Sequence, residues 1–189
     1  MLRKQIAILA ACSALGATAP ADSATGAGGT FTLTSPDIAP GGTIAAAQIY
    51  NGFGCSGSNV SPALMWSNAP EGTKSFALLM YDPDAPGSGW WHWVVYNIPA
   101  TVTSLPAGAG DAGKHLLPAG AVQGKTDFGT AAYGGPCPPP GKPHHYSLRL
   151  YALKVARLGV PADTPAARVG STASANSLAQ AELLGMYSR

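Results

Sequence analysis

Short hydrophobic runs separated by glycine and proline make up most of this chain. Residues 75–81 are almost all apolar, as in a strand that is buried on both faces. Residues 92–98 are β-branched and aromatic and end at a proline, which also indicates a strand. The run 146–154 alternates, so that its two expected faces carry different side chains: Tyr146, Leu148, Leu150 and Ala152 on one face, and Ser147, Arg149, Tyr151 and Leu153 on the other.

Weaker runs complete the predicted architecture. Residues 31–34, 63–66 and 121–123 indicate three further short strands, and residues 182–187 a last one. Residues 165–181 are rich in alanine and predict one or two helices. With 24 glycines and 17 prolines between the runs, the pattern favours a mainly β, antiparallel fold with a C-terminal helical segment.

Composition indicates a folded, single-domain protein. Of its 189 residues, 46% are hydrophobic and only 11% are charged, whereas disorder needs low hydrophobicity and high net charge. We expect one domain over residues 31–189, preceded by a flexible tail at residues 20–30.

The first nineteen residues have the three parts of an export signal. A basic start is followed by an apolar stretch at 6–15 and by small residues at Ala17 and Ala19, with a second cleavage candidate after Ala21. The apolar stretch is too short to span a bilayer. Residues 9–12 also resemble a lipoprotein box that would acylate Cys12. We therefore expect a periplasmic or secreted protein with no transmembrane segment.

Removal of the signal leaves a chain without net charge. Of eleven basic residues, Arg3 and Lys4 are lost, which leaves nine basic residues against nine acidic ones. Nucleic-acid binding needs a clustered basic surface, and membrane-surface binding needs a polybasic patch. Neither is present in the sequence. It gives no indication of the oligomeric state.

Two cysteines, Cys55 and Cys137, remain after cleavage, each in a glycine-containing loop. An even pair in an exported protein can form a disulfide, while two independent buried thiols are the alternative. The distance between them cannot be read from the sequence, so both possibilities stay open.

The first candidate patch for ligand chemistry is Asp82-Pro83-Asp84-Ala85-Pro86. Proline stiffens this loop and restricts its two carboxylates, which repel each other unless amides or a histidinium relieve the charge. His92 begins the next strand and can face Asp82 across a hairpin. By alternation from a pocket-facing His92, Trp93 is expected in the core.

The second patch is the proline-rich segment 133–141, which ends shortly before His144. Its glycines allow close backbone approach and are expected to offer free amides, which bind anions without any side-chain charge. The period of two places His144 and Tyr146 on the same side and His145 on the other. We therefore expect His144 and Tyr146 to share a pocket.

As a set, these motifs resemble the phosphatidylethanolamine-binding protein (PEBP) family, in its bacterial Raf-kinase-inhibitor-like branch. The resemblance covers about residues 31–189 and rests on Asn51-Gly52, Gly57, Asn59, Ser61-Pro62, Trp66, Asp82–Pro86, His92-Trp93, Asn97-Ile98-Pro99, Asp127-Phe128-Gly129, Tyr133–Pro139, Gly141, His144, Tyr146 and Tyr187-Ser188-Arg189.

The resemblance implies a fold of two antiparallel sheets packed as a PEBP-like β-sandwich, with a pocket for phosphate or a phospholipid headgroup. The pocket residues that it implies are Asp82, Pro83, Asp84, His92, Gly135, Pro136, His144 and Tyr146. The chain departs from the pattern at His145, where family members often carry arginine. The export signal separates the protein from cytosolic kinases, so the Raf-inhibitor role is not carried over.

We therefore predict a binding module for a small anion, without chemistry and without a cofactor. One alternative is an exported protease inhibitor or modulator of a protein partner, with the rigid loop 136–143 as its contact surface. Another is a weak phosphoester hydrolase or lyase in which Asp82 and His92 act as acid and base. No metal-binding motif and no Gly-x-Ser-x-Gly elbow is present in the sequence.

Overall fold

The computed structural model describes Met1 and residues 29–189, which hold one helix and eleven strands. The predicted export signal, the lipoprotein box at Cys12 and most of the predicted tail lie outside the described residues. The elements are β1 (Thr32–Thr34), β2 (Gly42–Thr43), β3 (Asn51–Gly52), β4 (Cys55–Ser56), β5 (Leu64–Ser67), β6 (Ser75–Asp82), β7 (Trp90–Pro99), β8 (Ser104–Leu105), β9 (Val122–Gln123), β10 (His144–Leu153), α1 (Ala166–Ala175) and β11 (Ser177–Tyr187).

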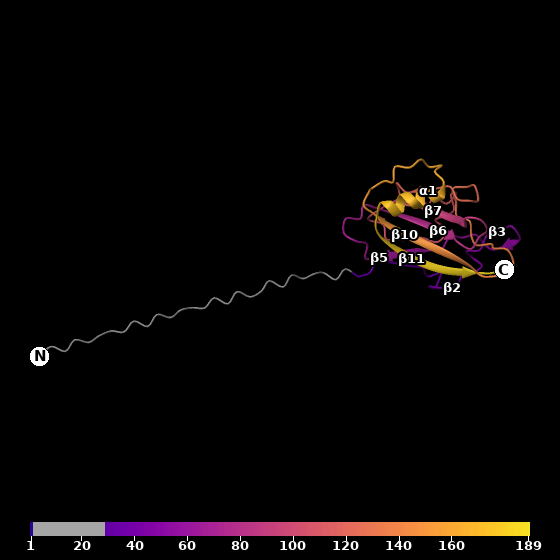
Figure 1. Cartoon of the computed structure of the whole chain (residues 1–189), viewed down its shortest axis with the longest axis horizontal. Coiled ribbons are helices and arrows are strands. Elements are labelled where there is room, and N and C mark those ends of the chain that lie inside the picture. The colour runs from indigo at the N-terminus through magenta and orange to yellow at the C-terminus, as the bar shows by residue number, and fades with distance from the viewer. Residues whose placement is uncertain (2–28) are drawn as a thin grey trace.

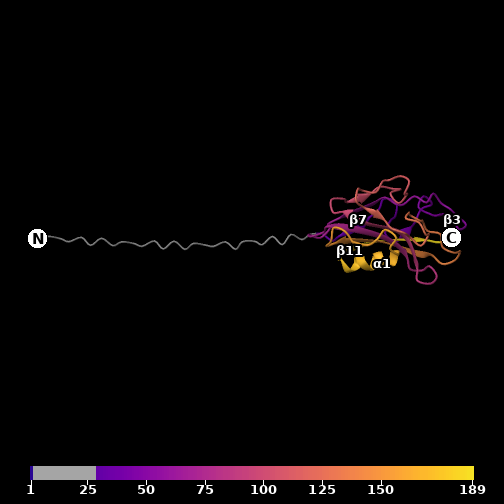
Figure 2. The same cartoon turned by 90° about the horizontal axis from the view of Figure 1, so that it is seen from above.

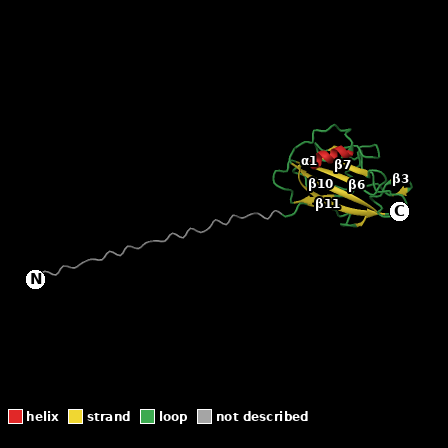
Figure 3. Ribbon diagram, in the orientation of Figure 1, coloured by secondary structure: helices red, strands yellow, loops and turns green. Residues whose placement is uncertain are grey.

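The two larger sheets and the helix form three layers, and β3 and β4 pair as a separate two-stranded sheet. The large sheet has the strand order β2-β11-β10-β6-β7-β9, and the small one has the order β1-β5-β8. Neighbouring strands are antiparallel except for β2 and β11, whose short pairing is parallel. In Figure 1 the four long strands run side by side with α1 across them, and Figure 2 shows α1 on one side of the sheet. Figure 3 shows how much of the surrounding chain is loop. The predicted sandwich with a helical segment is confirmed.

Two hydrophobic cores lie on the two faces of the large sheet. The core between the sheets takes Leu148 and Leu150 from β10, and the core beneath α1 takes Tyr151 and Leu153 from the same strand. The alternation of residues 146–154 therefore predicts both faces correctly. Central strand β6 supplies both cores and is buried along nearly its whole length, as its continuous apolar run indicates.

The C-terminal helix is shorter than predicted, because residues 177–181 belong to strand β11. Ala179 and Ala181 lie opposite Ala152 and Leu150 of β10. Alanine favours a helix in isolation, but its intrinsic preference is below about 1 kcal/mol per residue and tertiary pairing overrides it. The helix thus covers only residues 166–175.

Strand β7 contains two irregularities that sequence alternation does not reveal. One register shift leaves His92 without a partner, since Tyr81 pairs with Trp91 and Met80 with Trp93. The other lies near Asn97, which has a positive φ of 57°. The Asn97 side chain accepts a buried hydrogen bond of 2.8 Å from the amide of Leu158. This bond ties β7 to the loop that leads into α1.

Within residues 29–189, no helix is both long enough and apolar enough to cross a membrane. The C-terminus lies next to β3 in the views of Figures 1 and 2. Arg189 is held there by a hydrogen bond of 3.0 Å to the carbonyl oxygen of Phe53.

We expect Asn97→Ala to lower the free energy of unfolding by about 2 kcal/mol or more. The substitution leaves the buried Leu158 amide without a partner, which costs about 1–3 kcal/mol, and removes a residue type that tolerates positive φ. Urea denaturation measures the loss. Asn68→Ala is the matched control, because Asn68 also has a positive φ but its side chain bonds at an exposed position. Equal losses in the two variants would contradict the importance of the buried bond.

Candidate ligand-binding site

A cavity of about 170 Å³ lies where β6, β7 and β10 meet the proline-rich loop. Its base is formed by polar side chains and its walls by aromatic and proline residues. The lining residues are Phe53, Asp82, Ala85, Pro86, Trp90, His92, Phe128, Cys137, Pro138, Pro139, His144 and Tyr146. The fold therefore brings both predicted patches to one place.

The buried carboxylate of Asp82 fixes one side of the base. Its Oδ1 accepts hydrogen bonds from the amides of Asp84 and Ala85, at 2.8 and 3.1 Å. Its Oδ2 lies 2.8 Å from Nδ1 of His144. Asp82 is only 3% exposed, and these three contacts fix its carboxyl group so that it orients the His144 ring. The predicted partner across the hairpin, His92, does not bond to it.

His92 is oriented by the backbone of the proline-rich loop. Its Nδ1 lies 2.7 Å from the carbonyl oxygen of Gly134, and its ring packs edge-on against Phe128 and Tyr146. Burial lowers the pKa of His92 to about 4, with the Gly134 carbonyl opposing the shift. The ring is therefore neutral at pH 7. The register shift turns the His92 side chain toward Tyr146. The expectation that His92 and Trp93 point to opposite faces of the strand is therefore wrong, although Trp93 is a core residue as expected.

The hydroxyl of Tyr146 makes no hydrogen bond of good geometry with the described residues, although it is buried at the cavity and lies near the Asp82 carboxylate. Burial and the neighbouring Asp82 carboxylate raise the pKa of this phenol, so it stays protonated. A buried hydroxyl without a partner is costly, and such groups commonly bind water or a ligand.

Four of the residues expected at the pocket do not line the cavity, namely Pro83, Asp84, Gly135 and Pro136. The Asp84 carboxylate binds the backbone amide and Nδ1 of His145, both at 2.7 Å, and these bonds lower the pKa of Asp84. His145 thus holds Asp84 outside the cavity.

The expectation of free amides in the proline-rich loop is wrong for both of its first two glycines. The Gly134 amide donates to the carbonyl oxygen of His92, and the Gly135 amide donates to Oδ1 of Asn59 at 2.8 Å. Gly135 packs so tightly against the backbone near Gln48 that a Cβ there would lie 2.0 Å from the Gln48 carbonyl oxygen. The glycines therefore serve close packing and the placement of His92, rather than anion binding.

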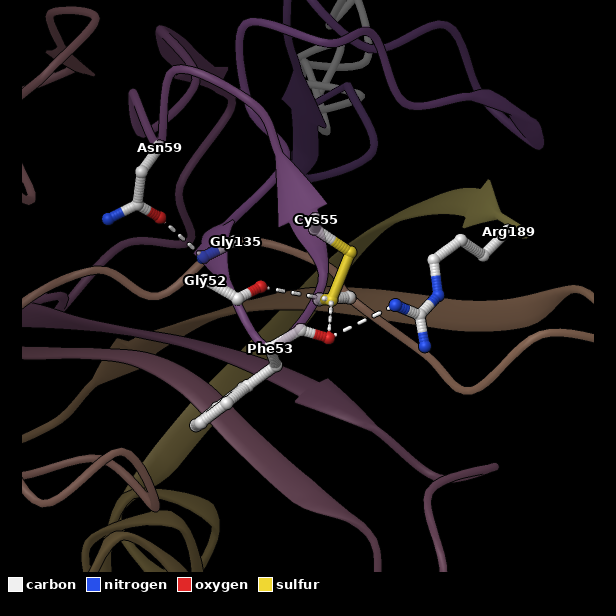
Figure 4. The surroundings of a disulfide bond; sticks show 7 residues. Gly52, Phe53, Cys55, Asn59, Gly135 and Arg189 are labelled. Carbon is white, nitrogen blue, oxygen red and sulfur yellow. Dashed lines mark hydrogen bonds between the residues drawn. A yellow bond between two sulfur atoms is a disulfide. The ribbon is translucent and has the colours of Figure 1, made fainter.

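A disulfide between Cys55 and Cys137 holds the outer wall, with 6.0 Å between the two Cα atoms. Figure 4 shows it between the β3–β4 hairpin and the proline-rich loop, next to Phe53 and Arg189. The Gly52 and Phe53 carbonyl oxygens lie 3.5 and 3.6 Å from Sγ of Cys137, but a disulfide sulfur has no proton to donate, so these are contacts and not hydrogen bonds. The bridge fixes the hairpin that carries Phe53.

Of the aromatic wall, the sequence indicates Trp90 at the rim of the pocket but not Phe53 and Phe128. Phe53 is 70% exposed and stacks on Phe128, with ring centroids 6.1 Å apart, and Trp90 meets Phe128 edge-on at 5.5 Å. The motif Asp127-Phe128-Gly129 gives a usable signal for Phe128. Nothing in the sequence around Phe53 indicates that it lines the same cavity as Phe128, which is distant from it in the chain. No group of three His, Cys, Asp or Glu residues in the described part of the chain is placed to hold a metal ion.

Comparisons with known proteins identify the family of this chain. A family model described as phosphatidylethanolamine-binding protein matches residues 34–188. The chain belongs to the phosphatidylethanolamine-binding protein family. The sequence resemblance is thereby confirmed.

Several relatives share most of the PEBP domain. The UPF0098 protein YbcL of Escherichia coli K12 is 53% identical over 159 residues, which cover 83% of this chain and 87% of YbcL. YbhB of the same organism is 44% identical, over 82% of this chain and 99% of YbhB. The crystal structure of E. coli YbcL, described as a new member of the mammalian PEBP family, superposes with a TM-score of 0.82 over 84% of this chain and 98% of that one, at 52% identity. A Mycobacterium tuberculosis relative that is named a putative lipoprotein, LppC, is 37% identical over 83% of this chain and 72% of LppC.

Replacement of both Cys55 and Cys137 by alanine should lower the free energy of unfolding by about 2–5 kcal/mol, because the bridge closes a long loop in the unfolded chain. The sequence separation is 82 residues. Urea denaturation with and without reductant measures the effect. Reductant should destabilise the wild type and leave the double variant unchanged. If reductant does not affect the wild type, the bridge does not stabilise the fold.

The buried His92 should make the protein less stable in mild acid. Its pKa is lowered to about 4 in the folded state from 6.5. The unfolded state therefore binds more protons below pH 6.5, and stability present above that pH is lost as the pH falls toward 4, by about 3 kcal/mol. Urea denaturation at several pH values checks this loss.

His92→Phe keeps the aromatic packing and removes the titrating group, so its stability should fall less steeply between pH 6.5 and 4. The carboxyl groups of Asp84 and Glu182, whose pKa values are lowered, affect both proteins alike. A variant with the slope of the wild type would show that His92 is not the titrating group.

Proposed function

We propose that this PEBP domain is a binding module for a small ligand that carries a phosphate group, either free or as part of a headgroup. The ligand enters the cavity with its phosphate at the base, near His92, His144 and Tyr146. Its remaining part lies against the aromatic and proline wall. Family membership supports a small-ligand binding protein, and the Tyr146 hydroxyl at the base favours a ligand that brings an acceptor oxygen.

The unpartnered hydroxyl of Tyr146 is the observation that carries the proposal. It is a donor that makes no hydrogen bond of good geometry within the described protein, it lies at the base of a cavity, and it neighbours two oriented imidazoles. An oxyanion oxygen at this place satisfies the hydroxyl. This relieves a desolvation cost of about 1–3 kcal/mol that the folded protein otherwise bears.

Binding without chemistry fits the residues at hand. The cavity lining contains no serine or threonine among the described residues, and its one cysteine is bound in the disulfide. Its phenol has a raised pKa and is a weak nucleophile. The Asp82–His144 pair could polarise a water molecule, so a weak phosphoester hydrolase is the second candidate. Release of phosphate from p-nitrophenyl phosphate that is lost in Asp82→Ala would favour that candidate over pure binding.

Export to an oxidising compartment is part of the proposal. A disulfide persists in the periplasm or outside the cell and is rare in the cytosol. The bridge between Cys55 and Cys137 and the resemblance of the N-terminus to an export signal both support this location. The relative named a lipoprotein supports an exported form too.

We expect Tyr146→Phe to weaken the binding of inorganic phosphate at least about fivefold without lowering the free energy of unfolding. The substitution removes a donor to the ligand but no bond within the protein. Calorimetric titration and urea denaturation measure the two effects on the same samples.

Tyr133→Phe is the matched control, because the Tyr133 hydroxyl is also buried but donates to the Gln48 carbonyl oxygen at 2.9 Å, away from the cavity lining. This variant should lose about 1 kcal/mol of stability and keep its phosphate affinity. The proposed function is wrong if the wild type binds no phosphate, or if Tyr146→Phe binds it as well as the wild type does.

A further inference from the structure

The two imidazoles at the base are held in a defined tautomer by their surroundings. A carbonyl oxygen only accepts hydrogen bonds, so Nδ1 of His92, 2.7 Å from the Gly134 oxygen, carries the proton. A neutral imidazole has one proton, which leaves Nε2 of His92 as an acceptor. No hydrogen bond within the described residues uses this nitrogen, and the ring lines the cavity.

The same reasoning applies to His144. Asp82 already accepts two amide bonds and lies 2.8 Å from Nδ1 of His144, so this nitrogen also donates. Nε2 of His144 is therefore an acceptor whenever its ring is neutral. It becomes a donor only when a second proton charges the ring.

The cavity is poor in donors and in positive charge. No lysine or arginine occurs among the described residues that line it, and the amides of Gly134 and Gly135 are occupied. The ionisable groups that face His92 are Asp82 at the end of β6, Asp127 in the loop after β9, and His144 and Tyr146 on β10. Two of these groups, Asp82 and Asp127, are acidic, and they disfavour an anion that carries no proton of its own.

We propose that the site selects an oxyanion that brings its own proton, such as hydrogen phosphate or a protonated phosphomonoester, over oxyanions without one. The ligand's hydroxyl donates to an imidazole Nε2, while one of its other oxygens accepts from Tyr146. This inference rests on the proposed function and specifies the ligand class of the same site. It disfavours a phosphodiester, the form of phosphate in a phospholipid headgroup, because a diester has no such proton.

Phosphate and sulfate make a well-matched pair of probes for this selection. At about pH 7.5 both are tetrahedral and mainly divalent, but phosphate keeps a hydroxyl and sulfate has none. Sulfate oxygens would lie against the lone pair of Nε2 and leave this buried acceptor unpaired. One missing buried hydrogen bond reduces affinity by about tenfold or more.

Calorimetric titration of the mature, disulfide-bonded protein at about pH 7.5 and constant ionic strength is the test, with inorganic phosphate, sulfate and dimethyl phosphate as probes. We expect phosphate to bind at least about tenfold more tightly than either protonless anion. Equal binding of phosphate and sulfate would overturn the inference and leave the proposed function standing. Binding of none of the three would overturn both.

Asp82→Asn tests the tautomer directly. The oxygen of the substituted amide side chain keeps the two backbone amide bonds, so its NH₂ group faces His144 and forces Nδ1 to accept. The proton of the neutral ring then moves to Nε2, which becomes a donor to the ligand. The ratio of phosphate to sulfate affinity should fall severalfold, with sulfate gaining.

Asp84→Asn is the matched control, because it removes a neighbouring carboxylate that lies outside the cavity and binds His145 instead. The ratio of phosphate to sulfate affinity in this variant should stay at the wild-type value. An equal fall of this ratio in Asp82→Asn and Asp84→Asn would mean that charge alone sets the preference for phosphate over sulfate, and would overturn the inference. If Asp82→Asn does not fold, His92→Phe takes its place: it removes an acceptor, and an undiminished ratio in that variant would also overturn the inference.

Discussion

The buried carboxylate of Asp82 is the constraint on which the site depends. It ends the central strand β6, closes the following turn through two amide bonds, and holds Nδ1 of His144 on the neighbouring strand β10. One side chain therefore fixes the shape of a loop, the orientation of a ring and the position of a negative charge. A single negative charge at 3% exposure is tolerable only because all of these bonds are made at once.

The rest of the fold brings the other groups to that carboxylate. The register shift in β7 turns His92 toward Tyr146, and the Gly134 carbonyl fixes its ring. The Gly135 amide is bound by Asn59, and the disulfide joins the same loop to the hairpin that carries Phe53. The proline-rich loop thus acts as a rigid wall held from two sides. Contacts within the protein fix the shape of the cavity, and such a prearranged wall reduces the entropy that binding must lose.

The sequence predicts the parts that depend on short-range periodicity. The alternation in β10 correctly assigns Leu148 and Tyr151 to opposite cores and brings His144 and Tyr146 to one cavity. It does not predict the partners of the glycine amides, because Asn59 lies 76 positions before Gly135. Helix propensity is a weak local preference, so the strand at residues 177–181 follows only from its pairing with β10.

The central claim, that the neutral ring of His92 presents an unprotonated Nε2 to the cavity, is tested most directly by nitrogen NMR of the ¹⁵N-labelled histidine side chains. At about pH 7.5 in the absence of ligand, the account predicts that the Nδ1-protonated tautomer of His92 predominates and that Asp82→Asn moves the proton of His144 from Nδ1 to Nε2. An Nε2-protonated or doubly protonated His92 under these conditions would contradict it.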